Sequence, residues 1–224
     1  MAKITKQIDN IVEMYGLSRR DDARALISAL FKSNDGSNIA KFIADYTESW
    51  IDDNIQLLFL EDACSLSGHI AICCLYGNLL LKLQQLDAAI PVFKKALTQE
   101  PHHIDALNGL SKALLDNNRI EEAQAIIAES LNFSKDNKET LAIYEQYILC
   151  TNQDHRVLLN NKGSATRAFQ YVLNNLINAG EIEKASEVFA RAIPAGSLTP
   201  VILTDYANAL NSAGYFEEAF EVWE

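Results

Sequence analysis

Polar side chains recur at matched places along this chain of 224 residues, and most of them are amides. Successive members follow one another at sequence intervals of 34, 34, 28 and 34. We call this set the polar row, and its members are Asn78, Lys112, Gln146, Asn174 and Asn208. An Asn or Gln amide both donates and accepts hydrogen bonds, so a ladder of amides can hold the backbone of an extended peptide without reading its side chains. The chemistry predicted from this row is reversible peptide binding.

Three further polar residues are added to this predicted binding surface because they share its register. Asn108 and Gln170 each lie one helical turn before a member of the polar row, and Arg167 lies two turns before Asn174. On a helix, these spacings place residues on one face. The predicted groove surface therefore comprises the polar row together with Asn108, Gln170 and Arg167.

Catalytic motifs are absent from the sequence, which holds no Gly-rich phosphate loop, no Gly-x-Ser-x-Gly and no His-Glu-x-x-His. His102 and His103 lie in a predicted turn without further ligands at metal-binding spacing. Cys64, His69 and Cys73 form a second zinc candidate, but Cys73 also falls in the predicted core. We therefore expect this segment to have no enzymatic activity, no cofactor and no metal.

A row of this kind needs helices that recur with the same period, and small residues supply that period. Ala89 and Ala123 are separated by the interval of 34, and so are Ala185 and Ala219. A large apolar residue follows each alanine one helical turn later, on the same face. These large residues are Phe93, Ile127, Phe189 and Trp223. A side chain larger than Ala would push two crossing helices apart, so the pattern predicts antiparallel helix pairs that approach closely at the alanine.

The first helix of each pair shows apolar residues at steps of three and four, as in Leu107-x-x-Leu110-Ser111-x-x-Leu114. Gly180 and Gly214 fall where the first helix turns into the second. We expect both to adopt positive φ angles, which glycine tolerates without steric cost. We call the first helix of each pair the A helix and the second the B helix.

This combination of period, residue sizes and turn residues resembles the tetratricopeptide-repeat family over residues 70–135 and 164–224. The resemblance implies an all-α fold, a right-handed superhelix of antiparallel helix pairs whose A helices line a concave groove. It also implies that a protein or peptide binds in this groove. Members that bind chaperone tails grip a C-terminal carboxylate with Lys and Asn side chains. Of those positions only Asn78 matches, and Glu139 would repel a carboxylate, so this mode is not expected.

We divide the chain into an N-terminal helical cap, residues 1–69, and about five repeats in residues 70–224. The cap is expected to contain three to five helices, with a degenerate repeat as the alternative for its last pair, and to cover the end of the stack. The repeats are 70–103, 104–137, a shortened unit 138–165, 166–199 and a truncated unit 200–224. The shortening follows from the interval between Ala123 and Ala185, which is smaller than two full periods.

Composition and charge indicate which classes of binding partner are unfavourable. The formal net charge of −11 disfavours nucleic-acid binding, which needs a surplus of Lys and Arg. No apolar run is long enough to predict membrane insertion, and the N-terminus lacks the apolar run of a signal peptide. Cys64, Cys73, Cys74 and Cys150 lie in helical patterns, and we expect them to be reduced, buried thiols of a cytoplasmic protein.

The leading functional hypothesis is a cytoplasmic scaffold that binds a peptide or partner protein in the groove. The last predicted repeat is cut off at Trp223, so we expect an N-terminal fragment of a longer protein. The alternative is therefore a substrate-presenting or regulatory region of a larger enzyme, such as a glycosyltransferase or sulfotransferase, whose catalytic domain would follow. A third hypothesis is a homo-oligomer formed through the uncapped end at Phe220 and Trp223.

Overall fold

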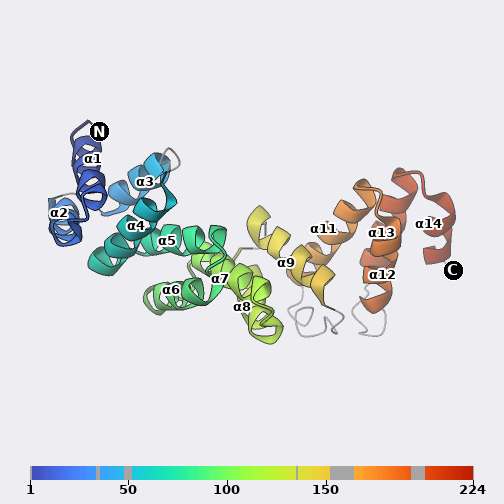
Figure 1. Ribbon diagram of the computed structural model, residues 1–224. Helices are drawn as coiled ribbons and strands as arrows, with labels where there is room; N and C mark the ends of the chain where they lie inside the picture. The colour runs from blue at the N-terminus through green and yellow to red at the C-terminus, as the bar shows by residue number, and fades with distance from the viewer. Residues whose placement is uncertain are drawn as a thin grey trace. The chain divides into compact units, whose positions relative to one another are not determined.

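The computed structural model describes residues 2–33, 36–47, 52–134, 136–151, 164–192 and 200–223. Within these ranges all regular structure is helical, in thirteen helices (Figure 1). The prediction of an all-α fold is thereby confirmed. The chain forms two compact units, Met1–Asn117 and Asn118–Glu224. The expected second helix of the shortened repeat, around residues 155–161, lies outside the described residues.

Helices α1 to α7 belong to the first unit. Their bounds are α1 Ala2–Gly16, α2 Arg20–Ser33, α3 Gly36–Thr47, α4 Asp53–Ser67, α5 Ile70–Lys82, α6 Leu86–Gln99 and α7 Ile104–Asp116. Helices α5 and α6 form a hairpin, and α7 packs against both of them. Helix α4 packs against α5, while the pair α1–α2 packs against α4. Helix α3 also packs against α5.

The core of the α5–α7 group is centred on Phe93 of α6, which is fully buried. Gly77 of α5 and Gly109 of α7 leave the space that its ring fills. The small residues of the repeat pattern therefore mark close helix approaches, as the sequence indicated. Ala89 and Ala96 on the same B helix are also buried.

A buried carboxylate joins the α1–α2 pair to α4. Asp62 accepts hydrogen bonds from the Tyr15 hydroxyl at 2.8 Å and from Nε and Nη2 of Arg20, each at 2.9 Å. Arg24 is a third donor, and Arg20 also donates to Glu61 at 2.6 Å. Burial alone would raise the pKa of Asp62, but the hydrogen bonds from Arg20 and Tyr15 and the charges of both arginines lower it below its ordinary value. The ionised form is therefore the stable one in the folded protein.

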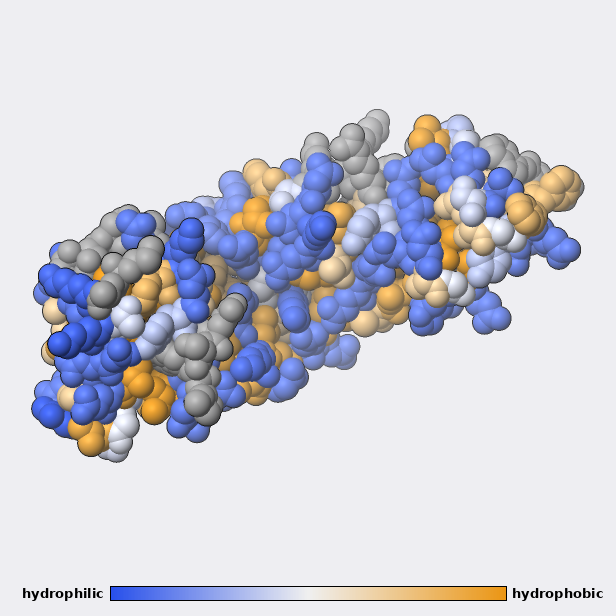
Figure 2. Space-filling model, turned by 90° about the horizontal axis from the view of Figure 1, so that it is seen from above, coloured by the Kyte–Doolittle hydropathy of each residue, from blue (hydrophilic) through white to orange (hydrophobic). Residues whose placement is uncertain are grey.

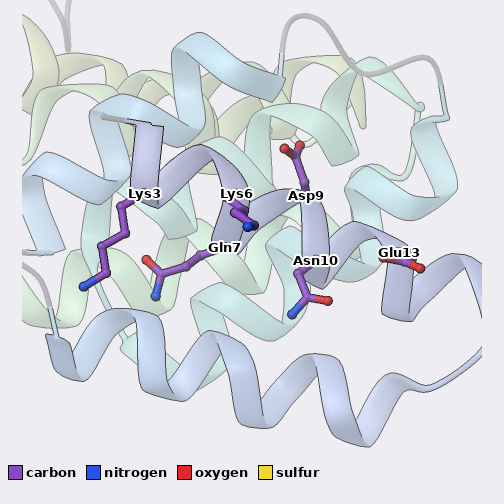
Figure 3. Close-up of a pocket in the computed structure, with 6 residues that line it drawn as sticks. All are labelled: Lys3, Lys6, Gln7, Asp9, Asn10 and Glu13. Atoms are coloured by element: carbon purple, nitrogen blue, oxygen red, sulfur yellow. The ribbon is translucent and has the colours of Figure 1, made fainter.

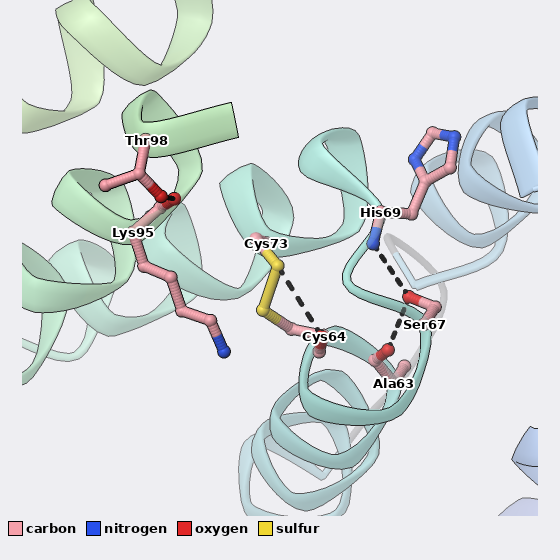
Figure 4. Close-up of a disulfide and its surroundings, with 7 residues drawn as sticks. All are labelled: Ala63, Cys64, Ser67, His69, Cys73, Lys95 and Thr98. Atoms are coloured by element: carbon pink, nitrogen blue, oxygen red, sulfur yellow. Dashed lines mark hydrogen bonds between the residues drawn. A yellow bond between two sulfur atoms is a disulfide. The ribbon is translucent and has the colours of Figure 1, made fainter. Parts of the chain in front are cut away.

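The expectation of four reduced, buried cysteines is wrong. Cys64 of α4 and Cys73 of α5 form a disulfide, with their Cα atoms 4.8 Å apart (Figure 4). Gly68 has a φ of 62° and ends α4 sharply, so the first turn of α5 returns along the last turns of α4. Cys74 is a free, buried thiol, and Cys150 is free and exposed. The cysteines therefore do not favour a cytoplasmic location.

The second unit contains the remaining helices of the described residues. They are α8 Ile120–Phe133, α9 Lys138–Cys150, α11 Ser164–Asn178, α12 Ile182–Ala192, α13 Pro200–Ser212 and α14 Phe216–Trp223. Helix α9 packs against α8 and α11, and α11 packs against α12 and α13. Helices α13 and α14 form a hairpin. Tyr144, Tyr147 and Phe169 are fully buried, and the rings of Phe189 and Tyr206 stack with centroids 4.2 Å apart.

Four turns between A and B helices share one left-handed residue. Gly180 and Gly214 have φ angles of 76° and 91°, which confirms the prediction for both. At the matching positions before α6 and α8, Gln84 has a φ of 58° and Asn118 a φ of 55°. The turn geometry therefore recurs even where the residue is not glycine.

Hydrophilic side chains predominate on the face drawn in Figure 2, and the hydrophobic ones form separate patches between them. Phe216 and Phe220 of α14 are 66% and 62% exposed. None of the helices in the described part of the chain combines the length and the apolar character needed to cross a bilayer.

Candidate binding surface

The polar row has two members in the first unit. Asn78 lies on α5 and Lys112 on α7, and both side chains are exposed. Because α5 and α7 pack against each other, the two residues occupy equivalent positions on neighbouring A helices. Neither side chain forms a hydrogen bond or ion pair with another residue in the described ranges. Their polar groups are therefore available to a ligand.

The other three members lie in the second unit. Asn174 on α11 and Asn208 on α13 are exposed, whereas Gln146 on α9 is half-buried. Helix α11 packs against both α9 and α13, so the three residues follow one another across adjacent helices. Asn174 and Asn208 thus present two amides to solvent at matched helical positions, and each amide can both donate and accept hydrogen bonds.

Hydrogen bonds between side chains hold these three helices beside one another. The Asn175 amide donates to Oε2 of Glu145 at 3.0 Å, which links α11 to α9. The Gln170 amide donates to the Asp205 carboxylate, which links α11 to α13. Both donors are close to Asn174 in sequence. The spacing of the row in this unit is therefore fixed by side chains next to it, in addition to the core.

The three additional residues of the predicted groove, Asn108, Gln170 and Arg167, are less accessible than the polar row or lie outside the described side chains. The expectation that Asn108 is exposed is wrong, since it is only 1% exposed. Gln170 is half-buried and its amide is engaged by Asp205. Arg167 lies on α11, but its side chain is outside the described residues. The accessible part of the predicted surface is consequently the polar row.

A thiol and an imidazole meet between α5 and α7, an arrangement that can support nucleophilic catalysis. The Cys74 Sγ lies 4.0 Å from Nδ1 of His103. However, burial raises the pKa of Cys74 to about 12, with a further contribution from the nearby carboxylates of Asp105 and Glu100. His103 Nδ1 also accepts the backbone N–H of Ala106 at 3.4 Å and so caps α7. The thiol is therefore protonated near neutral pH, which does not favour a nucleophilic role.

The described side chains also do not form a metal site. The described residues contain no group of three or more His, Cys, Asp or Glu side chains placed to hold a metal ion. Cys64 and Cys73, two of the three ligands of the zinc candidate, are bonded to each other and cannot act as thiolate ligands.

A site that the sequence did not reveal lies between α1 and α3. A pocket of about 550 Å³ is lined there by Ile4, Asn38, Lys41, Phe42, Asp45 and Tyr46. The sequence places these residues in the predicted helical cap. Covering the end of the stack requires only the buried face of the cap, so that role does not predict a pocket on its exposed face. The available signal was the half-exposed pair Phe42 and Tyr46, two aromatic residues one turn apart on one helix.

Comparison with known families identifies one match. The family model described as the tetratricopeptide repeat matches residues 80–155. The match includes Lys112 and Gln146 of the polar row. No curated protein sequence matches the chain.

Solved structures give weaker similarities. A tetratricopeptide-repeat protein from Parabacteroides merdae is 12% identical, with a TM-score of 0.47, and the match covers 99% of this chain and 91% of that one. A MamA double mutant is 12% identical with a TM-score of 0.44, covering 88% of this chain and 96% of that one. A putative protein-binding protein from Bacteroides ovatus is 13% identical with a TM-score of 0.38, covering 96% of this chain and 98% of that one.

Proposed function

We propose that the chain is an interaction scaffold that binds an extended segment of another protein at the polar row. The match of residues 80–155 to the tetratricopeptide-repeat family model supports this proposal. The observation that carries this proposal is the pair Asn174 and Asn208, exposed at matched positions on the adjacent helices α11 and α13. The bond between Gln170 and Asp205 supports it, because it fixes the separation of the two helices before a ligand arrives.

Amides suit this task because a peptide backbone alternates N–H donors with C=O acceptors. One Asn side chain can accept from the first and donate to the second, whatever side chains the peptide carries. Preorganised helices also reduce the ordering entropy of binding, since only the ligand has to lose conformational freedom. In the first unit, Asn78 repeats this chemistry, and Lys112 adds a positive charge that suits an acidic side chain or a carboxylate.

The experiment is a double replacement, Asn174→Ala and Asn208→Ala, in the full chain. Each lost side-chain hydrogen bond is worth about 1 kcal/mol, so we expect the Kd for a captured partner to rise at least about tenfold. Partners are first recovered by affinity capture with the unmodified chain and identified by mass spectrometry. The Kd of each partner is then measured by calorimetry with the unmodified chain and the variant.

A matched control changes exposed residues on the B helices instead. Glu183→Gln on α12 and Glu217→Gln on α14 leave the polar row intact, so partner affinity should stay within about twofold of the original. Equal affinity of the amide variant and the control variant for every captured partner would refute the proposal.

A further inference from the structure

The solvent-facing side of α1 carries its charges in an order that a single helix does not favour. Lys3 and Lys6 lie in the first two turns of α1, and Glu13 lies in the last turn. Carboxylates are favoured at the N-terminal end of a helix and cations at the C-terminal end, because of the helix dipole. Helix α2 follows that order, with two aspartates in its first turn and a lysine in its last turn. The charges on α1 therefore do not stabilise their own helix through its dipole.

A hollow of about 650 Å³ runs along this side of α1. The residues that line it follow one another along the helix, from Lys3 at one end to Glu13 at the other (Figure 3). They are Lys3, Lys6, Gln7, Asp9, Asn10 and Glu13. Gln7 is half-buried and the other five are exposed. Ile8 and Ile11 fill the core on the opposite side of the helix, so the hollow opens to solvent.

The charges at the two ends of this hollow have no opposite charge bound to them. Neither lysine nor Glu13 forms an ion pair with another residue in the described part of the chain. Lys6 and Glu13 are separated by about 10 Å along the helix axis, which is too far for a direct contact within α1. Asp9, the other carboxylate, accepts a hydrogen bond from the Tyr46 hydroxyl of α3.

This side of α1 is neutral although the whole chain carries a net charge of −11. Two lysines at one end balance the two carboxylates of Asp9 and Glu13. Two chains of the same net charge repel each other, and a neutral face is where that repulsion is weakest. The separation of positive and negative charge along one helix also makes the face complementary to a reversed copy of itself.

A twofold axis perpendicular to α1 would pair this helix antiparallel with the same helix of a second copy, so that one surface forms both sides of the interface. With the axis at Asn10, Lys6 of each copy lies opposite Glu13 of the other. The two Asn10 amides then meet at the axis, where each can donate to the oxygen of the other. The pairing satisfies the charges that α1 leaves unpaired, and it does so twice.

We propose that the chain forms a reversible homodimer in which α1 packs antiparallel on α1 of a second copy, through the reciprocal pairs of Lys6 with Glu13 and with Lys3 adding positive charge beside them. Exposed ion pairs are individually weak, so the dimer dissociates on dilution. No residue of the polar row lies on α1, and the interface is separate from that surface. A dimer carries two polar rows, which strengthens binding to a partner with repeated segments.

The test measures self-association of the full chain by sedimentation velocity, from micromolar to millimolar concentration. We expect a monomer–dimer equilibrium that shifts toward the monomer in concentrated salt, where exposed charges are screened. Two variants remove the complementarity. The acidic variant carries Lys3→Glu and Lys6→Glu, and the basic variant carries Glu13→Lys. Each variant alone should self-associate at least about tenfold more weakly, because like charges then face each other.

Mixing the two variants tests the antiparallel order. Each acidic position of one variant then lies opposite a basic position of the other, so the mixture should form a heterodimer with about the affinity of the unmodified chain. A fluorescent label on one variant reports its faster sedimentation when the other is added. Circular dichroism confirms that both variants are folded, which their exposed positions favour.

Two control variants change exposed residues elsewhere. Lys95→Glu on α6 matches the charge change, and Phe220→Ser removes an exposed aromatic side chain at the other end of the chain. Both should dimerise like the unmodified chain. The proposal is overturned if the chain stays monomeric at millimolar concentration, if the mixed variants do not associate, or if Phe220→Ser abolishes the dimer. Because no ligand is present, none of these outcomes bears on the polar row.

Discussion

The ring of Phe93 occupies the space that a side chain at Gly109 would need. A Cβ atom placed on Gly109 would lie 2.3 Å from two carbon atoms of that ring. Helix α7 can therefore approach α6 this closely only because residue 109 has no side chain. The Phe93 ring of one predicted repeat fills the space left by this glycine of the next.

We expect Gly109→Ala to destabilise the first unit by about 1–3 kcal/mol, because overpacking a dense core forces side chains off their preferred rotamers. Urea denaturation followed by circular dichroism measures the loss. Gly16→Ala is the matched control, since Gly16 has no atom within 4 Å of an added Cβ and ends a helix at the surface. Combining Gly109→Ala with Phe93→Leu should recover part of the lost stability; losses that simply add would show that the ring is not the cause.

The buried carboxylate gives a second prediction. Asp62→Asn removes the charge that accepts hydrogen bonds from Tyr15, Arg20 and Arg24, so we expect a loss of about 2–3 kcal/mol at pH 7. The two arginines are partly exposed and can be solvated, which keeps the loss below that of a fully buried pair. Glu61→Gln is the matched control, because Glu61 binds the same Arg20 but is 45% exposed. Its cost should stay below about 1 kcal/mol.

The pH dependence of that loss follows from the lowered pKa of Asp62. A carboxyl group whose pKa is lower in the folded than in the unfolded chain stabilises the fold fully above its unfolded value, about 4. That contribution is lost as the pH falls further, through the folded value. The stability difference between the unmodified chain and Asp62→Asn should therefore shrink below about pH 4. A difference that stays constant from neutral pH down to strongly acidic pH would contradict the assignment.

The disulfide between Cys64 and Cys73 is tested by counting thiols. A chain unfolded without reductant should show two reactive thiols, Cys74 and Cys150, and four after reduction. Cys64→Ser should lower the free energy of unfolding by about 2–3 kcal/mol, because the bond closes a short loop in the unfolded chain. Cys150→Ser, at an exposed free thiol, should have little effect. Four thiols in the unreduced protein would show that the bond does not form.

The left-handed turn residues offer a stabilising substitution. Gln84 has a φ of 58°, a conformation that costs a residue with a side chain about 1 kcal/mol relative to glycine. Gly180 and Gly214 occupy the same position in other turns, so Gln84→Gly should raise the stability of the first unit by up to about 1 kcal/mol. Thermal unfolding measures the change, with Gln85→Gly as the comparison one residue later, where we expect a loss.

The repeat itself could be predicted because many positions in each repeat are restricted to a particular residue size. Small residues such as Ala89 and large ones such as Phe93 recur with the period, and close packing leaves few alternatives at those places. The exposure of Asn78, Lys112, Asn174 and Asn208 then follows from register. The cap has no such period, so the sequence predicts only that it contains three to five helices and does not reveal the pocket formed by Ile4, Phe42 and Tyr46.

Asn108 shows where register alone fails. It lies one turn before Lys112, which places the two only about 40° apart around the helix axis. A modest rotation of α7 decides which one is covered, and sequence spacing does not measure that rotation. The disulfide was missed for a related reason. Cys64 lies before the first clear repeat, so nothing in the period indicated that it would meet Cys73.

The recurrence of one turn conformation at Gln84, Asn118, Gly180 and Gly214 also bears on how the chain folds. The turns at Gln84, Gly180 and Gly214 each close a hairpin of two helices that are neighbours in sequence, so the loop entropy is small and the relative contact order is low. Chains with these properties fold fast, and nucleation can begin at any hairpin and spread to the next. We therefore expect the α5–α6 hairpin to form early during synthesis and Phe93 to complete its packing once α7 has been added.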